Sequence, residues 1–242
     1  MSIASEALQR RVRVAARTLS RHGLAQAWGH CSARLDDSHF LVCAARPMGR
    51  IAVGEAGTIV PIDGALPDGV LGEVRIHQQI YKRRPEVGGV CRVMPAVTVA
   101  LSILHQVPQP RHGVGAFNAA CRLWEDPRLL RNDGWAAQLA EHMGDSPSLV
   151  MRANGAVTVG PCIELAVGFA WCLEDSAKME QRVRTMAGEQ SLESAALLDG
   201  EIGLRQVSSG RVFERLWEYL ASDDAEFDAE FGEFSPPVWG SR

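Results

Sequence analysis

The sequence lacks the long apolar run that a membrane-spanning helix requires. No segment of its 242 residues approaches the roughly 20 consecutive apolar residues that cross a bilayer. The N-terminal segment MSIASEALQRRVRV also has no apolar centre of the kind found in secretion signals. We therefore expect a cytoplasmic protein that has no membrane partner.

A large excess of positive charge is absent too. The formal net charge is −4 at pH 7, and the Lys and Arg residues are scattered along the chain. Nucleic-acid-binding domains usually carry a basic patch or stripe, so we expect no nucleic-acid partner. The basic stretch RRVRVAAR near the N-terminus reads instead as one face of an amphipathic helix.

Cysteine pairs with the spacing of zinc sites are missing as well. None of the six cysteines forms a CxxC pair, and all lie in apolar stretches. We expect reduced, buried thiols that pack as small apolar side chains, and no zinc site built from them. They are Cys31, Cys43, Cys91, Cys121, Cys162 and Cys172.

The composition that remains is that of an ordinary globular domain. Apolar residues make up 46% of the chain and charged residues 22%, which are typical values. No internal repeat or low-complexity linker divides the sequence. We predict a single α/β domain with a layered sheet over residues 1–220, followed over residues 221–242 by an acidic tail that contains Phe and Pro.

Helical and strand patterns alternate along the chain. We predict helices over residues 4–22, 73–83, 95–104, 134–143, 163–186 and 210–220. We predict a strand hairpin within 29–44, a strand and turn within 58–66, a buried strand within 87–94, and two short strands within 149–159. The segment 105–118, rich in Pro, Gly and His, is expected to be a functional or covering loop, and the tail is expected to be extended.

Four short segments, taken together, resemble one known family. They are GHCSAR at 29–34, GEVRIH at 72–77 followed by Ile80 and Tyr81, VCRVMP within 90–95, and MRANGAVTVG at 151–160. In this order and spacing they are similar to the motifs of class II aldolase/adducin proteins. The GHxSAR form and the Trp217-x-Tyr219 pattern resemble the family's aromatic-acid decarboxylases more than its sugar-phosphate aldolases.

The resemblance implies a fold and an assembly. Members of the family have a central, mostly antiparallel sheet with helices on both faces. They are homo-oligomers, commonly tetramers, whose active sites lie between neighbouring subunits. We therefore expect this fold, a small-molecule substrate that carries negative charge, and a homotetramer.

The resemblance also implies that the family's metal site is altered at every ligand position, because it places three metal-binding histidines at Arg92, Met94 and Asn154. Arg is a permanent cation, which repels a metal ion. A thioether and an amide are poor substitutes for imidazole at a divalent cation. We therefore expect neither a metal nor another cofactor at this place.

Glu73 and Arg92 are the strongest candidates for catalytic groups. In the family's aldolases the carboxylate that corresponds to Glu73 acts as general acid and base, although a Glu near a helix N-terminus also has a structural role. Arg92 offers two aligned donors for a carboxylate or an enolate in place of the metal. The alternative is a decayed site in which Arg92 only pairs with Glu73.

His30 is the third catalytic candidate, and several neighbours are candidates for substrate binding. His30 would bind a substrate oxygen or move a proton, unless it is structural. Arg34 would reach a substrate anion or form a surface ion pair, and His77 shares a helix face with Glu73. The full substrate-binding set is Gly29, Ser32, Arg34, His77, Met94, His112 and Asn154.

Other conspicuous side chains are expected to be part of the packing. Strand alternation turns Cys91 away from the Arg92 face and into the core. We also interpret Tyr81, Trp28 and Trp217 as packing residues.

Two classes of function fit the sequence. The first is a metal-independent carbon–carbon lyase, of decarboxylase or aldolase type, or an isomerase that uses the same enolate-type intermediate. The second is a catalytically inactive, adducin-like domain that serves binding or assembly. The retained Glu73 and His30 favour an enzyme, whereas the loss of all three metal ligands favours a binding domain, and fold alone does not decide between them.

Overall fold

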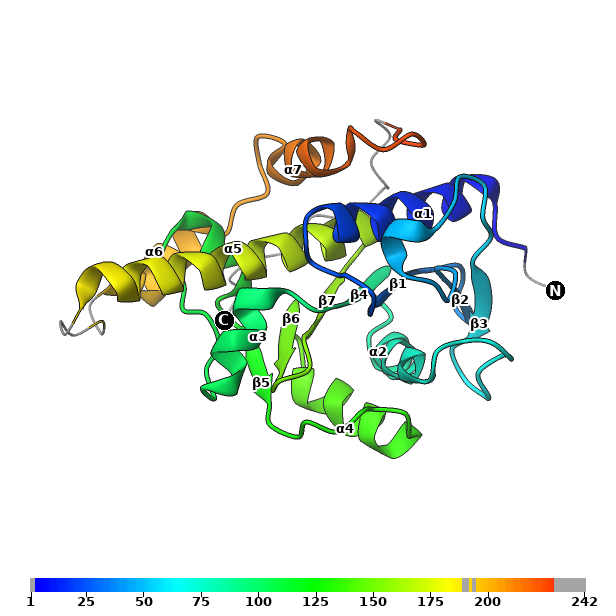
Figure 1. Ribbon diagram of the computed structural model, residues 1–242, viewed down its shortest axis with the longest axis horizontal. Coiled ribbons are helices and arrows are strands. Elements are labelled where there is room, and N and C mark those ends of the chain that lie inside the picture. Colours follow the sequence, from blue (N-terminus) through cyan, green and yellow to red (C-terminus); the bar gives the residue numbers. More distant parts are fainter. Residues whose placement is uncertain (1–2, 189–191, 193–194, 229–242) are drawn as a thin grey trace.

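The computed structural model describes residues 3–188, 192 and 195–228, and one seven-stranded sheet forms its centre (Figure 1). The strand order is β3-β2-β1-β4-β7-β6-β5, and every neighbouring pair is antiparallel except β5 and β6. This confirms the predicted, mostly antiparallel sheet. The strands are β1 His30–Arg34, β2 His39–Val42, β3 Thr58–Pro61, β4 Gly89–Val93, β5 Arg122–Trp124, β6 Ser148–Met151 and β7 Ala156–Gly160.

Helices cover both faces of the sheet, as expected. Helices α1 (Glu6–Arg21), α5 (Ile163–Ala187) and α7 (Val212–Ala221) pack over one face, and α2 (Arg75–Arg83) and α4 (Asp133–Met143) over the other (Figure 1). The remaining helices are α3 Ala96–Ile103 and α6 Asp199–Arg205, with 3-10 turns η1 Met48–Arg50, η2 Gly72–Val74 and η3 Gly113–Asn118. In the described part of the chain, no helix is both long and apolar enough to cross a membrane.

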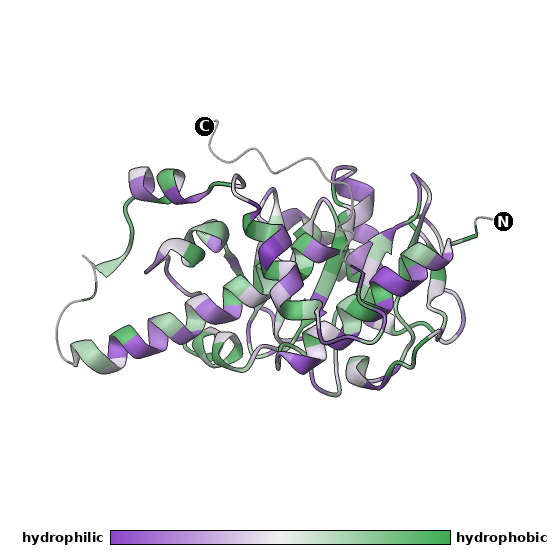
Figure 2. Ribbon diagram, turned by 90° about the horizontal axis from the view of Figure 1, so that it is seen from above, coloured by the Kyte–Doolittle hydropathy of each residue, from purple (hydrophilic) through white to green (hydrophobic). Residues whose placement is uncertain are grey.

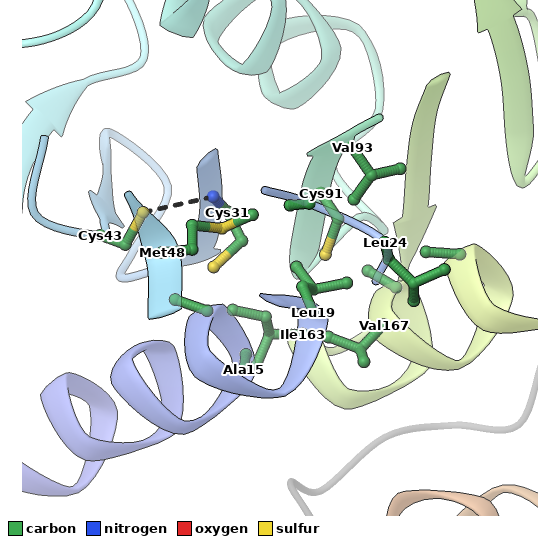
Figure 3. Packing of buried hydrophobic residues seen from close by; sticks show 14 of the residues in the cluster. Ala15, Leu19, Leu24, Cys31, Cys43, Met48, Cys91, Val93, Ile163 and Val167 are labelled. Atoms are coloured by element: carbon green, nitrogen blue, oxygen red, sulfur yellow. Dashed lines mark hydrogen bonds between the residues drawn. The ribbon is translucent and has the colours of Figure 1, made fainter. Parts of the chain in front are cut away.

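Side-chain alternation along the strands divides the interior into two cores. On β4, Cys91 and Val93 belong to the core under α1 and α5 (Figure 3), whereas Val90 belongs to the core under α2 and α4. Cys91 therefore faces away from Arg92, as predicted. Figure 2 shows hydrophobic residues concentrated in the sheet and hydrophilic residues distributed over the surrounding helices.

The cysteines also conform to expectation where the structure describes them. All six are free thiols; Cys121 is partly exposed and the other five are buried. Cys31 and Cys43 lie side by side in the core that Figure 3 shows, where the amide of Cys31 donates to Sγ of Cys43 at 3.5 Å.

Local side-chain contacts explain where two of the helices begin. The Ser5 hydroxyl accepts the amide of Leu8 and caps α1. Helix α3 has no cap of its own, and the buried carboxylate of Glu174 on α5 accepts the amides of Val97 and Thr98. A carboxylate at this position also interacts favourably with the helix dipole.

Several sequence predictions need correction. The edge strand β5 and helix α6 were not predicted, and the expected loop 105–118 contains the turn η3. Trp217 is buried as expected, but Trp28 is 68% exposed and does not pack in the core.

The start of the C-terminal tail is not extended. Residues 222–226 form turns, and Asp224 and Glu226 make ion pairs with Arg13 and Arg17 of α1. The rest of the predicted tail, residues 229–242, lies outside the described residues.

Candidate active site

The register of the sheet places His30 directly opposite Arg92. Strands β1 and β4 are antiparallel, and the two residues are Cα partners, so both side chains lie on the face that α2 covers. Gly29 immediately precedes β1 with a φ of 133°, and a Cβ at that position would lie 2.8 Å from the Arg92 carbonyl oxygen. Only glycine allows the two backbones to approach this closely.

The guanidinium of Arg92 is the centre of a polar cluster. Its Nη2 donates to Oδ1 of Asn154 at 2.9 Å and to Oε2 of Glu73 at 3.2 Å. Its Nη1 contacts Sδ of Met94 and donates to the Val93 carbonyl at 3.3 Å. The three positions at which the family resemblance implies metal ligands therefore converge, and the Arg92 guanidinium joins them. We call Glu73, Arg92, Met94 and Asn154 the site cluster.

A tight turn between β6 and β7 brings Asn154 to this point. Ala153 and Gly155 have φ angles of 56° and 85°, and the amide of Asn154 donates to the Met151 carbonyl. A Cβ on Gly155 would lie 2.1 Å from the Val93 carbonyl oxygen and 2.7 Å from Sδ of Met94. Glycine at this position therefore allows the turn to lie against the end of β4.

The site cluster is buried at its centre and reaches the surface at its rim. The Arg92 side chain is 4% exposed and that of Glu73 15%, and Met94 and Asn154 are half-buried. The second oxygen of Glu73 accepts the amide of Leu130 at 3.3 Å. The cluster can thus meet a molecule that arrives from outside.

The charge of Arg92 is only partly compensated. Burial lowers the pKa of the Arg92 guanidinium, and the Glu73 carboxylate only partly offsets that effect. Two buried donors of the cluster, Nε of Arg92 and Nδ2 of Asn154, have no hydrogen-bond partner in the described structure. A buried donor without an acceptor costs about 1–3 kcal/mol, so the cluster is suited to receive an anionic acceptor.

These side chains do not fit a divalent metal ion. Oδ1 of Asn154 and Sδ of Met94 are both in contact with the Arg92 guanidinium, whose fixed positive charge repels a cation. No group of three His, Cys, Asp or Glu that could hold a metal ion occurs in the part of the chain that the structure describes.

A second buried network adjoins the site cluster. Nδ1 of His30 lies 2.8 Å from Nε2 of His77, and Nδ1 of His77 lies 2.6 Å from the Ser32 hydroxyl. The Ser32 hydroxyl lies 2.9 Å from the hydroxyl of Tyr81. We call these four residues of β1 and α2 the histidine chain.

Burial keeps both imidazoles of the histidine chain neutral at pH 7. It lowers the pKa of His77 to about 3, with a further contribution from the charge of Arg92. It also lowers the pKa of His30 well below its ordinary value, with contributions from His77 and Arg92. Both rings can therefore accept a proton as well as donate one.

Two predicted substrate-binding residues do not join this site within the chain. Arg34 donates to the main-chain carbonyls of Val87, Tyr81 and Arg84, so within the chain its guanidinium interacts with the C-terminal end of α2. His112 lies instead against α5, where its Nε2 is 2.9 Å from Oδ2 of Asp175. The structure brings together the other predicted residues, which are Gly29, His30, Ser32, Glu73, His77, Arg92, Met94 and Asn154.

Tyr81 is the network member that sequence reasoning missed, because we interpreted it as a packing residue. It is indeed buried, with its ring centroid 4.9 Å from that of Phe40. However, its hydroxyl also donates to the Ser32 carbonyl at 3.1 Å. Its spacing of four residues from His77 on a predicted helix was the available signal, since such residues share a face.

Comparisons with known proteins agree with the architecture. The family described as Class II Aldolase and Adducin N-terminal domain matches residues 10–181. A 3,4-dihydroxyphthalate decarboxylase from a Terrabacter species is 27% identical over 194 residues, which cover 73% of this chain and 81% of the relative. A 3,4-dihydroxyphthalate decarboxylase from Arthrobacter keyseri is 29% identical over 197 residues, covering 73% and 79% respectively.

Solved structures show the same fold. An L-fuculose-1-phosphate aldolase from Thermus thermophilus superposes with a TM-score of 0.67 at 24% identity, covering 76% of this chain and 98% of that one. An aldolase II superfamily protein from Pseudomonas syringae gives a TM-score of 0.72 at 21% identity, covering 90% and 92%. At these identities the similarity concerns the fold alone.

Proposed function

The chain belongs to the class II aldolase and adducin family, and we propose that it is a lyase that removes CO2 from a small aromatic carboxylate without a divalent metal. Two relatives named 3,4-dihydroxyphthalate decarboxylase support decarboxylation. Aldol cleavage and isomerisation use a similar enolate-type intermediate, but the relatives at 27% and 29% identity are both named as decarboxylases.

The observation that carries this proposal is the incompletely compensated guanidinium of Arg92. It is nearly inaccessible to solvent, and among the described residues it has one carboxylate partner and an Nε donor without an acceptor. The neighbouring Nδ2 of Asn154 is unpaired as well. A substrate carboxylate or phenolate supplies the acceptors that the protein does not, and charge-assisted hydrogen bonds of this kind are the strong ones.

The proposed reaction replaces a carboxylate by a proton. A proton first bonds to the ring carbon that carries the carboxylate, with the electron pair supplied through the ring by a phenolate oxygen, so that this carbon becomes tetrahedral. The bond from this carbon to the carboxyl carbon then breaks, CO2 leaves, and the electron pair returns to the ring and restores the aromatic phenolate. Arg92 stabilises the negative charge that develops on the ring oxygen, which is the contribution expected of a fixed cation in a site with little water.

Glu73 and His30 are the groups that move protons in this scheme. Glu73 is at the partly exposed rim beside Arg92, where it can pass a proton between solvent and substrate. His30 is opposite Arg92 across the β1–β4 pair and also lines a small cavity with Cys43, Leu71 and Val74. Glu73 at the rim and His30 on the neighbouring strand are thus the candidate proton-transferring groups beside Arg92.

One observation favours a second candidate, a binding domain without activity. Both η nitrogens of Arg92 already have acceptors inside the chain. In that case the guanidinium holds β4 to the Asn154 turn and to Glu73, and a ligand would have to displace one of these contacts. This candidate predicts binding of a small anion without turnover.

The test is an assay of chelator-treated protein with 3,4-dihydroxyphthalate, with CO2 and the dihydroxybenzoate product as readouts. We expect turnover to persist after chelation and metal analysis to find no stoichiometric divalent ion. The variants Arg92→Ala and Arg92→Lys should each lower kcat/KM by about 100-fold or more, the usual cost of removing a preorganised charge-stabilising donor.

The control is Arg46→Lys, since Arg46 is an exposed partner of Glu55 that lies outside the site cluster. Activity that disappears on chelation and returns with Mn²⁺ or Zn²⁺ would overturn metal independence. Unchanged kinetics in both Arg92 variants would overturn the role of Arg92. Tight binding of catechol carboxylates without turnover would identify a binding domain.

We further propose that the chain works as a homo-oligomer, as the family resemblance implies. A tetramer with sites between subunits would cover the part-exposed rim at Glu73, Met94 and Asn154. Light scattering after size exclusion measures the assembly, and a monomer with full activity would contradict the proposal.

A further inference from the structure

The hydrogen bonds of the histidine chain all run in one donor-to-acceptor direction, because each of its members has few hydrogens to donate. The Tyr81 hydroxyl has one hydrogen, and it donates to the main-chain carbonyl of Ser32 at 3.1 Å. Toward the Ser32 hydroxyl, 2.9 Å away, the Tyr81 oxygen can then only accept. The single hydrogen of the Ser32 hydroxyl is therefore directed at Tyr81.

The same count fixes the tautomer of His77. With its own hydrogen engaged by Tyr81, the Ser32 oxygen must accept from Nδ1 of His77 across the 2.6 Å contact. A neutral imidazole carries one N–H, so Nε2 of His77 has no hydrogen. It accepts from Nδ1 of His30 at 2.8 Å.

The remaining ring nitrogen, Nε2 of His30, is then left without a hydrogen. It has no hydrogen-bond partner among the residues that the structure describes. His30 is also one of the residues that line the cavity between β1, the end of β2 and the segment before α2. In the reverse arrangement the Tyr81 hydroxyl donates to the Ser32 hydroxyl, and the 3.1 Å contact between the Tyr81 hydroxyl and the Ser32 carbonyl is left without a hydrogen.

We propose that Tyr81, Ser32 and His77 are positioning residues that hold the proton of His30 on Nδ1 and so make Nε2 the proton-accepting atom of the site. This rests on the proposed function, in which His30 moves a proton. Nε2 of His30 takes the proton of a substrate hydroxyl, and the electron pair stays on that oxygen as a phenolate. The proton resides on Nε2 until the hydroxyl is restored after CO2 has left.

Tyr81 determines the direction of the hydrogen bonds in the histidine chain, because it is the terminal member of that chain. In Tyr81→Phe, the Ser32 hydroxyl loses its acceptor and is free to donate to Nδ1 of His77. His77 would then carry its hydrogen on Nε2 and donate to Nδ1 of His30, which moves the hydrogen of His30 to Nε2. One substitution far from the substrate is thus expected to convert the base into a donor.

Neutron diffraction from crystals exchanged into D2O tests this directly, because it locates deuterium on each ring nitrogen. In the wild type we expect deuterium on Nδ1 of both His30 and His77 and none on Nε2 of His30. In Tyr81→Phe we expect deuterium on Nε2 of both rings. The Phe side chain keeps the ring that packs against Phe40 and lies under the guanidinium of Arg34.

Deuterium on Nε2 of wild-type His30 would overturn the proposal, and so would unchanged tautomers in Tyr81→Phe. Turnover provides a separate readout. We expect His30→Gln to lower kcat by about 100-fold, in the range of general base catalysis, and Tyr81→Phe to lower it at least tenfold. If the tautomers are as expected but His30→Gln retains full turnover, the failure lies in the proposed function and not in the proton arrangement.

Discussion

Arginine side chains are buried both in the site cluster and on α1, and the two regions treat the charge differently. In the site cluster, Arg92 is 4% exposed, and its carboxylate partner among the described residues is Glu73, at 3.2 Å. On α1, Arg17 is 12% exposed, and Oδ1 of Asp224 and Oε2 of Glu226 lie 2.6 and 2.7 Å from its Nη2. We call Arg13, Arg17, Asp224 and Glu226 the α1 clasp.

The pKa shifts of the two regions run in opposite directions. Hydrogen bonds donated to Glu226 and Asp224 raise the pKa of Arg13 and Arg17 respectively, although burial opposes this effect. Burial lowers the pKa of Arg92, and Glu73 offsets this effect only in part. In the α1 clasp, Arg13 and Arg17 therefore each have two carboxylate partners, whereas the guanidinium of the site cluster keeps positive charge that another anion can compensate.

The largest effect on stability is expected in the α1 clasp. Arg17→Met leaves the Asp224 carboxylate, which is 1% exposed, with Arg21 as its remaining Arg partner in the described chain. Removing one partner of a buried ion pair costs about 3–5 kcal/mol, and we expect a loss of this size in denaturant unfolding. The exposed pair of Arg46 and Glu55 is the control, and Arg46→Met should cost at most about 1 kcal/mol. A loss equally small at Arg17 would remove the contrast between the two regions.

In the site cluster, replacement of the arginine by methionine should lower turnover and leave the free energy of unfolding nearly unchanged. Arg92→Met is expected to lower kcat/KM by about 100-fold, equivalent to about 2.7 kcal/mol. The free energy of unfolding should stay within about 1 kcal/mol of the wild type, because Met is a neutral side chain of similar length and Glu73 can be solvated at the rim. Parallel assays and unfolding curves measure both quantities. A loss of stability as large as that of Arg17→Met would show that Arg92 is a structural residue.

The sequence predicted the site cluster better than the α1 clasp, for a physical reason. Arg92, Met94 and Asn154 are at positions of short motifs with fixed spacing, and strand alternation alone separates Arg92 from Cys91. The clasp joins Arg17 to Asp224, which are 207 positions apart. No local pattern records such a contact, so the acidic residues after α7 were interpreted as part of an extended tail.

The features that were not predicted near the site have similar causes. Arg34 occurs in the GHCSAR motif, but its partners are main-chain carbonyls, which leave no trace in the sequence. The hydrogen bonds of Tyr81 depend on how α2 is placed against β1, which periodicity does not determine. Strand β5 has only three residues, Arg122–Trp124, too few for an alternating pattern to be recognised.

A pH series should distinguish the acid sensitivity of the histidine chain, which adjoins the site cluster, from that of the α1 clasp. The pKa of His77 is about 3 in the fold and about 6.5 in an unfolded chain. The stability from neutral His77 is therefore complete above pH 6.5 and is lost as pH falls toward 3, by about 1.4 kcal/mol per pH unit. The fall from pH 6.5 to 5 thus amounts to about 2 kcal/mol. Asp224 and Glu226 have lowered pKa values despite burial, so the α1 clasp weakens only below about pH 4.

Unfolding free energies measured across this range distinguish the two contributions. His77→Gln should flatten the decline between pH 6.5 and 5, whereas the exposed His105, substituted as His105→Gln, should leave it unchanged. An undiminished slope in His77→Gln would mean that the acid sensitivity arises from His30, whose pKa burial also lowers, or from outside the histidine chain.

The smallest effect on stability and turnover is expected when the site cluster receives a second carboxylate, as the arginines of the α1 clasp have. Asn154→Asp gives Arg92 a second carboxylate where Oδ1 of the amide now accepts from Nη2. A hydrogen bond to a charged group contributes about 1 kcal/mol more than a neutral one, so we expect the variant to unfold at a free energy about 1 kcal/mol higher at pH 7. The added carboxylate also takes the role proposed for the substrate anion, so KM should rise about tenfold. Asn154→Ala removes the amide without adding charge and should not gain stability. If Asn154→Asp is less stable than the wild type, or binds substrate equally well, the positive charge of Arg92 is already compensated in the wild type. The proposed contrast with the arginines of α1 would then be wrong.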